Sequence, residues 1–351
     1  MTLKETLETI KEYLKTNKDL SQLLTGDGSF INCYNKSTHR LHGRVDTLGA
    51  TTYRMTHSVP NLTQLSKDQE FRELLTVPEG KLLVSSDAGA LELVMMGHYL
   101  GEFDNYLFAK AVDSGDKSKG TDIHTINQKK AELPTRDAAK TFIYATIYGA
   151  GATKIGLMLW DKNTKLNYTD NEFKSEYDKL SNQIIYIDNK PYFPADKGSV
   201  MPFNDDLIKK SLYGQKILNS FRDNTLGYNE LVFKMTTLAD QDKLYGLDGR
   251  KLYPRASYKA LNLMLQSAGA IYMKHLLVLI DKRLRQNWTL NKEFSYVANI
   301  HDDLEFEIIP EIKDEFCQII EQSFIDTSYN LGLKYPVYGE PSVGKTQWEV
   351  H

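Results

Sequence analysis

Two cations and two phenols recur at helical spacing in the segment TRDAAKTFIYATIYG. They are Arg136, Lys140, Tyr144 and Tyr148, each four residues after the one before. On a helix each such step advances ~6 Å and turns by ~40°, so the four side chains line one broad face. Arg followed by Lys one turn later can grip consecutive phosphates, while a Tyr beyond them meets a sugar or a base. The alternative is an ordinary amphipathic helix with a hydrated basic face.

Aspartates that suit a divalent cation occur at two distant places in the sequence. Asp87 ends the apolar run KLLVSSD, and Asp302 and Asp303 lie at the turn of a predicted hairpin between FSYVANI and LEFEIIP. One antiparallel sheet can bring a strand end and a hairpin turn side by side. Two ions held there would serve the attacking and leaving oxygens of a phosphoryl transfer. The alternative is that turns favour aspartate for local hydrogen bonds.

The segment GEPSVGKT, residues 339–346, fits the phosphate-binding pattern G-x-x-x-x-G-K-[ST]. A working P-loop opens a helix whose N-terminal amides bind the phosphates. Only five residues follow Thr346, too few for that helix, so we reject a P-loop here. We expect Trp348 to be a packing anchor and Lys345 a surface charge.

The composition indicates a globular protein of about two domains or subdomains, with 351 residues and 41% hydrophobic content. Two cysteines, no apolar N-terminal stretch and no long apolar run predict a reducing, cytoplasmic location without a membrane. The net charge is −3, but acidic residues are concentrated after residue 300. The rest of the chain is therefore mildly basic, which permits a polyanionic partner without requiring one.

Several elements must position these residues. The chain opens with a predicted helix, where Thr2 and Glu5 form a capping box and Leu7, Ile10 and Leu14 recur at helical spacing. Residues 160–245 are polar and indicate a surface-facing helical insertion. In the predicted hairpin, apolar residues alternate with Glu305 and Glu307, which is typical of a half-buried strand.

The ordered motifs resemble the polymerase portion of a family A DNA polymerase, and most closely the short replicases of podovirus-type phages. The matching segments are GATTYRMTHSVPNLTQL (49–65), SSDAGALEL (85–93), TDIHT (121–125), RDAAKTFIYATIYGAG (136–151), LDGRKLYPRASYKALNLMLQSAGA (247–270) and IHDD (300–303). The resemblance implies an α+β fold: a polymerase palm, formed by an antiparallel sheet with flanking helices, and an inserted helical fingers subdomain. The expected ranges are an N-terminal helical segment at 1–29, palm at 30–105 and 248–351, and fingers at 106–247.

The resemblance also implies a catalytic machinery. Asp87, Asp302 and the backbone carbonyl of Ala88 are expected to hold two Mg²⁺ ions, with Mn²⁺ as a substitute. Lys140 is the expected acid for the departing pyrophosphate, which suits an amine whose pKa its surroundings can tune.

Further roles follow from the same resemblance. The residues expected to contact the dNTP are Arg136, Lys140, Tyr144, His124, Glu92 and Ala88, with Tyr144 near the 3′ position and Glu92 crowding the 2′ position. The residues expected to contact primer-template DNA are Arg54, Tyr148, Asn262, Gln266 and His301. Arg54, Asn262 and Gln266 would test minor-groove acceptors, which lie in nearly equivalent places for every base pair. A structural histidine is the alternative for His124 and His301.

The sequence departs from the family pattern at three places: Asp303 stands where Glu is usual, Tyr53 replaces Gly before Arg54, and Gly89 replaces Ser. A shorter carboxylate would hold a more distant ion less well, so Asp303 is not assigned as a ligand. The exonuclease and most of the thumb lack a counterpart, which predicts either a separate polypeptide that supplies them or an excised or minimal polymerase. Alternatives are a single-subunit RNA polymerase, against which Glu92 argues, and a non-catalytic DNA-binding subunit.

Overall fold

The computed structural model describes residues 3–161, 163–195 and 199–351, which fold into two compact units. Unit 1 comprises Met1–Leu91, Tyr245–Arg250 and Gln266–His351, and unit 2 comprises Glu92–Leu244 and Lys251–Leu265. The predicted N-terminal helix is α1 (Leu3–Leu23), but Thr2 of the predicted capping box lies outside the described residues.

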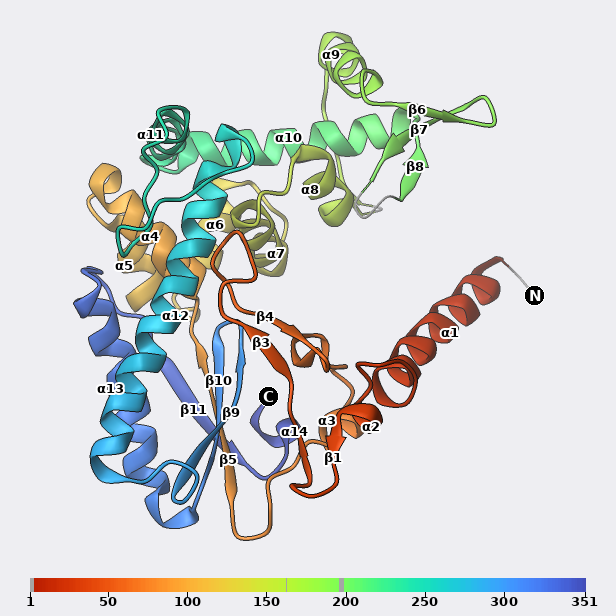
Figure 1. Cartoon of the computed structure of the whole chain (residues 1–351). Coiled ribbons are helices and arrows are strands. Elements are labelled where there is room, and N and C mark those ends of the chain that lie inside the picture. The colour runs from red at the N-terminus through yellow and green to blue at the C-terminus, as the bar shows by residue number, and fades with distance from the viewer. Residues whose placement is uncertain (1–2, 162, 196–198) are drawn as a thin grey trace. The chain divides into compact units, whose positions relative to one another are not determined.

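Unit 1 is built on a four-stranded antiparallel sheet (Figure 1). Its strands, in spatial order, are β11 (Gly339–Gly344), β5 (Leu82–Ala88), β10 (Asp303–Ile308) and β9 (Phe294–Ile300). The long connections between these strands run through helices, and only β9 and β10 form a hairpin. The sheet and its helices confirm the predicted α+β class.

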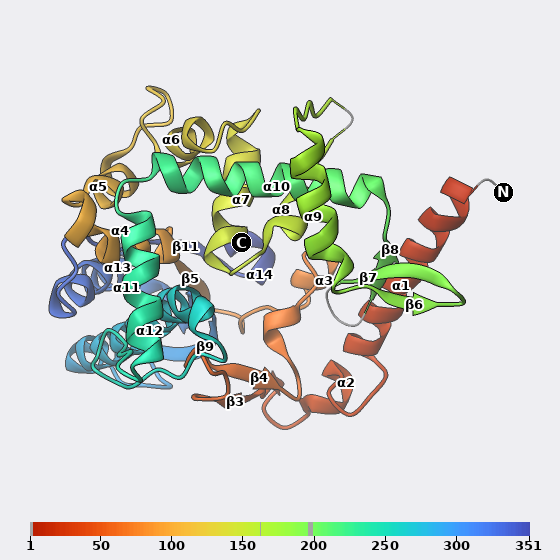
Figure 2. The ribbon, with the colours of Figure 1, turned by 90° about the horizontal axis from the view of Figure 1, so that it is seen from above.

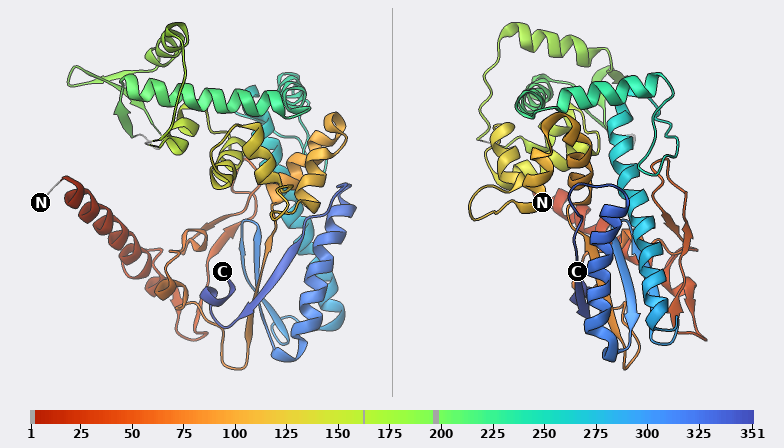
Figure 3. Two further views of the ribbon diagram at one scale, coloured as in Figure 1. Left: turned by 180° about the vertical axis from the view of Figure 1, so that it is seen from behind. Right: turned by 90° about the vertical axis from the view of Figure 1, so that its left-hand side faces the viewer.

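One face of β10 packs against aromatic side chains of helix α13 (Lys313–Asn330). The Phe306 ring lies 5.3 Å from that of Phe316, at a steep angle typical of packed aromatic pairs. Helix α12 (Ala260–Asn287) joins this core, because the buried Tyr272 hydroxyl donates to the carbonyl of Phe324 at 2.6 Å. In Figure 1 and the left view of Figure 3, α13 lies on one side of the sheet and α14 (Gln347–Val350) on the other.

The opposite face of β10 is also covered, which corrects the prediction of a half-buried strand. All six residues of β10 are buried, including Glu305 and Glu307. Residues far away in the sequence contact these two acids: His351, which follows α14, pairs with Glu305, and Arg40 in β2 pairs with Glu307. The alternation of apolar and acidic residues within β10 cannot indicate such distant contacts.

The segment that precedes β5 forms short elements. They are α2 (Phe30–Cys33), β1 (Tyr34–Asn35) paired with β2 (Arg40–Leu41), β3 (Arg44–Asp46) paired with β4 (Thr56–Ser58), η1 (Leu62–Gln64) and α3 (Gln69–Arg72). Helix α1 precedes them and extends away from the sheet (Figure 1).

The C-terminal segment does not form a P-loop. Most of GEPSVGKT is strand β11, paired with β5, and the four-residue helix α14 follows. The prediction for Trp348 was wrong: its side chain is 41% exposed, and Gln347 and Val350 are the buried residues of α14. A helix this short can bury only one side, and Trp348 lies on the other.

Unit 2 is mainly helical. Its helices are α4 (Leu91–Asp104, from Glu92 on), α5 (Leu107–Ser114), α6 (Ile123–Lys130), α7 (Arg136–Ile147), α8 (Ala152–Leu159), α9 (Asp170–Ser181), α10 (Asp205–Asn224), α11 (Tyr228–Asp240), η3 (Ser257–Lys259) and the first residues of α12. Figure 2 shows α10 running beside α6, α7 and α8. Helices α8 and α10 approach closely because glycines meet at their contact: a Cβ on Gly156 would lie 1.7 Å from the Lys210 carbonyl oxygen.

The predicted helical insertion at 160–245 contains a three-stranded antiparallel sheet, so the prediction was wrong there. The strands are β6 (Ile185–Ile187), β7 (Lys190–Pro194) and β8 (Val200–Pro202). Asp188 and Asn189 both have positive φ and close the β6–β7 hairpin, as type I′ turns require. Phe193 and Met201 pack with α9 and α10 in a separate small core.

The limits of the two units differ from the predicted ranges of palm and fingers. Most of α4 belongs to unit 2, because Gly97 packs against Ala109 of α5 and Phe103 against Gly227 before α11. Within the described residues, Ser257–Asn287 is long and apolar enough to cross a membrane, but 67% of its apolar window is buried inside the protein. That burial is typical of a core helix.

Candidate active site

The end of the sheet in unit 1 brings two predicted metal ligands together. Asp87 lies opposite Asp303 in the β5–β10 register, and the backbone N–H of Ala88 donates to the carbonyl of Asp302 at 2.9 Å. Asp302 occupies the hairpin turn with His301, whose φ of 61° is left-handed. Asp87 is exposed at the end of a strand whose preceding residues are buried. Carboxylate oxygens at such an accessible position suit a hard divalent cation.

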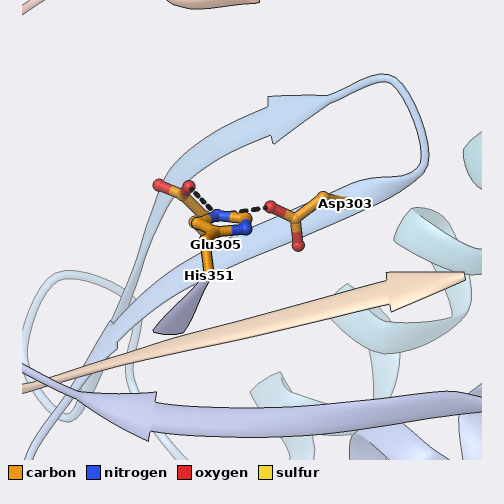
Figure 4. Close-up of side chains that lie close together, drawn as sticks. All are labelled: Asp303, Glu305 and His351. Carbon is orange, nitrogen blue, oxygen red and sulfur yellow. Dashed lines mark hydrogen bonds and ion pairs between the residues drawn. The ribbon is translucent and has the colours of Figure 1, made fainter. Parts of the chain in front are cut away.

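A second group of ionisable side chains lies on the same strand. The His351 Nε2 atom is 3.1 Å from Asp303 Oδ2 and 3.0 Å from Glu305 Oε1 (Figure 4). Hydrogen bonds to Asp303 and Glu305 raise the pKa of His351 to about 9, although burial opposes this. His351 is therefore a cation at neutral pH. Sequence reasoning missed this group, and its only signals were the alternating acids of β10 and a histidine near a strand that pairs with β5.

Arg54 and His301 line one small pocket in unit 1, together with Tyr53, Lys274 and Asn299. The Arg250 guanidinium lies 4.8 Å from the centre of the Tyr53 ring, a cation–π distance. The pocket gathers cationic and hydrogen-bonding groups from three distant parts of the sequence.

Gln266 is half-buried on α12 in the same unit and is not among the residues that line this pocket. The structure therefore groups Arg54 with His301, but it does not add Gln266 to them.

Helices α6 and α7 in unit 2 begin next to one another, and an ion pair joins their first turns. Asp122 caps α6, and its Oδ1 accepts from Arg136 Nε at 3.0 Å and Nη2 at 2.8 Å. Burial alone would raise the pKa of Asp122, but hydrogen bonds from Arg136 and Thr125 outweigh it and lower the pKa to about 2. Asp122 was not predicted. Its signal was an aspartate directly before a helix and one residue before His124 in TDIHT.

The predicted phosphate-binding residues gather around this ion pair. The rings of His124 and Tyr144 are 6.1 Å apart, and Lys140 is exposed on α7 between Arg136 and Tyr144. Burial lowers the pKa of His124, and the nearby charges of Arg136 and Lys140 lower it further. His124 is therefore neutral at physiological pH, and its buried Nδ1 atom has no hydrogen-bond partner among the described residues.

The C-terminal end of α7 connects to two further predicted residues. The Tyr148 hydroxyl donates to Glu92 Oε1 at 2.6 Å, and Glu92 is buried at the start of α4. The Asn262 side chain donates to the carbonyl of Ile147. Gly149, with a φ of 80°, ends the helix as glycine commonly does. Tyr148 is thus fixed at one edge by a carboxylate, while 46% of its side chain stays exposed.

An open groove of about 990 Å³ lies beside Tyr148, entirely within unit 2. Helices α7 and α8 form one wall, and strands β7 and β8 contribute to the other. Among the residues that the structure describes, its lining is largely apolar and aromatic and includes Lys154: other lining residues are Tyr144, Tyr148, Met158, Phe193 and Met201. Apolar and aromatic walls with a cation suit the bases and backbone of a single nucleic-acid strand.

Unit 1 therefore has an antiparallel sheet with clustered carboxylates at one end, and unit 2 is a helical unit with a basic helix face. These features define a polymerase-type fold. Residues 1–350 match the family model described as DNA polymerase family A. The chain belongs to this family, in agreement with the resemblance noted in its motifs.

Individual relatives support the same assignment. The chain is 32% identical over 317 residues to the DNA-directed DNA polymerases of Enterobacteria phage T3 and of Escherichia phage T7, a match that covers 85% of this chain. The chain spans 39% of the length of each of these relatives.

A solved structure has a similar fold. The POL domain of Pol1 from M. smegmatis, in complex with DNA primer-template and dNTP, aligns with a TM-score of 0.66 and 18% identity. The alignment covers 92% of this chain and 50% of that one.

Proposed function

We propose that the chain is the catalytic portion of a template-directed DNA polymerase that adds dNTPs to a primer 3′-hydroxyl. The observation that carries the proposal is the pairing of β5 with β10, which puts Asp87 beside the Asp302 turn. Membership of DNA polymerase family A supports the same activity. The phage relatives suggest the cytoplasm of a host cell as its location.

Asp87, Asp302 and the backbone carbonyl of Ala88 would hold two Mg²⁺ ions, with Mn²⁺ as a substitute. The fit rests on donor chemistry, because Asp87 offers an exposed carboxylate at a strand end and hard divalent ions prefer oxygen ligands. When bound, the ions supply positive charge for the attacking and leaving oxygens of the phosphoryl group.

The side chains of α6 and α7 would bind the triphosphate. Arg136 offers a planar donor group already oriented by Asp122, and Lys140 presents an exposed ammonium one turn later. In this proposal Lys140 gives its proton to the departing pyrophosphate. His124, neutral at physiological pH, offers a ring nitrogen to a phosphate oxygen, and Tyr144 lies against the sugar.

Glu92 and Tyr148 would together select deoxyribonucleotides. The hydrogen bond between them holds the buried carboxylate in place, so that a 2′-hydroxyl would meet it. Tyr148 and the groove beside it would receive the template strand, and Arg54, Asn262, Gln266 and His301 would contact primer-template DNA. Lys154 in the groove wall is a suitable contact for the phosphate backbone.

A separate polypeptide would supply the thumb, the 3′–5′ exonuclease or both. The chain spans 39% of its phage relatives, and α1 offers a place for a partner to bind. Leu7, Ile10 and Leu14 lie on one face of α1 and are 57%, 48% and 60% exposed. Apolar residues spaced in this way form the seam of helix–helix contacts.

Primer extension with Mg²⁺, primer-template DNA and the four dNTPs tests the activity. Low salt is the right condition, because contacts to DNA phosphates release counterions and duplex DNA therefore binds more tightly at low salt. We expect Asp302→Ala to lower the rate at least about a hundredfold, as expected when a group that supports transition-state charge is lost.

Asp314→Ala is the matched control, because Asp314 is an exposed acid in α13 of the same unit. It should extend the primer as the unaltered chain does. Equal rates for the unaltered chain and Asp302→Ala would contradict the proposal, as would robust primer-independent use of rNTPs.

A further inference from the structure

Asp303, Glu305 and Glu307 line the face of β10 that points away from its aromatic core. All three are buried, with exposed fractions of 5%, 4% and 3%. Buried carboxylates are costly unless cations pair with them. The cations are His351, within 3.1 Å of Asp303 and 3.0 Å of Glu305, and Arg40, whose Nη1 atom is 2.7 Å from Glu307.

Asp303 has a further cost, because it lies directly opposite Asp87 in the strand register. Like charges at opposed positions of an antiparallel pair destabilise the sheet. The same position brings Asp303 near any cation that Asp87 holds. Its two oxygens are occupied by other groups: Oδ1 accepts from the Ser85 hydroxyl at 2.7 Å, and Oδ2 forms the ion pair with His351.

Glu305 is engaged in the same way. Its Oε1 atom faces His351 and also accepts from Gln347 Nε2 at 3.1 Å. Gln347 and His351 both come from the segment around α14, so this segment supplies two of the groups that satisfy the carboxylates of β10. Without His351, Asp303 and Glu305 would lose the cation that they share, and carboxylate oxygens are the ligands that hard divalent ions prefer.

We propose that His351 is a positioning residue: by pairing with Asp303 and Glu305, it keeps these carboxylates from taking the divalent ions that Asp87 and Asp302 hold. The inference rests on the proposed function for the role of Asp87 and Asp302. His351 itself contacts neither the nucleotide nor the ions. It acts by leaving Asp87 and Asp302 as the carboxylates available to the ions.

The test is Mn²⁺ binding to the full chain without DNA, followed by electron paramagnetic resonance of the free ion. We expect His351→Gln to raise the bound Mn²⁺ by about one ion per chain, because Asp303 and Glu305 become available as ligands. His351→Arg retains a cation and should bind as the unaltered chain does. So should the double variant His351→Gln with Glu305→Gln, because it removes one of the released carboxylates.

Arg40→Gln is the matched control for stability. It removes the other cation of the same strand face and leaves Glu307 unpaired, so we expect a fall in Tm of roughly 5 °C without additional Mn²⁺. We expect a similar fall in Tm for His351→Gln. An unchanged circular dichroism spectrum below that Tm shows that this variant is folded.

An equal count of bound Mn²⁺ in the unaltered chain, His351→Gln and His351→Arg would overturn the proposal. So would a lower count of bound Mn²⁺ in His351→Gln than in the unaltered chain, because the ring would then be a ligand itself. Failure of the proposed function is separate: the unaltered chain would then not extend a primer, whatever the Mn²⁺ count of the variants.

Discussion

The ion pair between Arg136 and Asp122 constrains how α7 can bind a phosphate. The Nε and Nη2 atoms of Arg136 both donate to one carboxylate oxygen of Asp122, Oδ1. The Arg136 side chain is 29% exposed. A guanidinium has five donor hydrogens, so the remaining ones stay available to an anion. Asp122 thus orients Arg136 and leaves some of its donor hydrogens available to a phosphate.

Replacing Arg136 by Lys should distinguish the contribution of positive charge to dNTP binding from that of the planar donor group. A lysine keeps the positive charge but loses the planar pair of donors, so we expect the KM for dNTP to rise about tenfold with a smaller change in kcat. Steady-state primer extension at varied dNTP concentration measures both constants.

Arg285→Lys is the control, because Arg285 forms a similar ion pair with Asp281 in unit 1. An equal rise in KM for both variants would show that the effect is not specific to Arg136.

His351 makes the stability of the protein depend on pH. Its pKa in the folded protein is about 9, above the ordinary value of 6.5. The stabilisation is therefore fully present below pH 6.5 and is lost as the pH rises through about 9. We expect a loss of about 2 kcal/mol, less than the full shift implies because water reaches part of the ring.

Urea unfolding across this pH range measures the effect. The difference in unfolding free energy between the unaltered chain and His351→Gln should shrink as the pH rises, and a constant difference would contradict the prediction.

At the scale of the helix, the contact between α8 and α10 depends on two glycines. A Cβ on Gly214 would lie 2.0 Å from the Ala152 carbonyl oxygen, which is backbone and cannot move aside. The two helices must therefore separate to admit even a methyl group.

We expect Gly214→Ala to destabilise the protein by about 2 kcal/mol, although alanine favours helices, because overpacking outweighs that preference. Thermal unfolding followed by circular dichroism measures the change. Gly151→Ala is a suitable control, since a Cβ there meets nothing within 4 Å. A stabilised Gly214→Ala would contradict the close approach.

The elements that the sequence predicted well are those with strong local signals. The four-residue spacing from Arg136 to Tyr148 is visible in the sequence, and the structure has helix α7 from Arg136 to Ile147. The sheet β6–β8 was missed because its strands are only three to five residues long. Segments this short show too few alternations to be distinguished from loops.

In the candidate site too, features with a local sequence signal were predicted, and contacts between residues distant in sequence were not. The motifs around Asp87 and Asp302 predicted their common sheet, because a strand end and a hairpin turn are local features. The cover of Glu305 and Glu307 depends on Arg40 and His351, more than 40 residues away in sequence. Their alternation predicted exposure, and only the tertiary fold shows the cations that bury them.

At the scale of the whole molecule, the exposed face of α1 is the surface at which we propose that a partner binds. Leu7→Glu combined with Leu14→Glu should abolish binding to the proposed thumb-bearing polypeptide, because charges replace apolar contacts. Both side chains are exposed, so the Tm of the chain alone should change little.

Analytical ultracentrifugation of the mixed polypeptides measures this binding. Glu8→Gln with Lys11→Gln is the control, since these residues lie on the same helix and are also exposed. Undiminished binding by the Leu7 and Leu14 variant would place the partner elsewhere.

The position of His351 also affects how the protein is best produced. Residues fused after His351 would start beside two buried carboxylates, and a polyhistidine tag would add further imidazoles and any nickel they carry at that point. Such a fusion would compete with His351 for Asp303 and Glu305. An affinity tag is therefore better attached before α1, which extends away from the sheet.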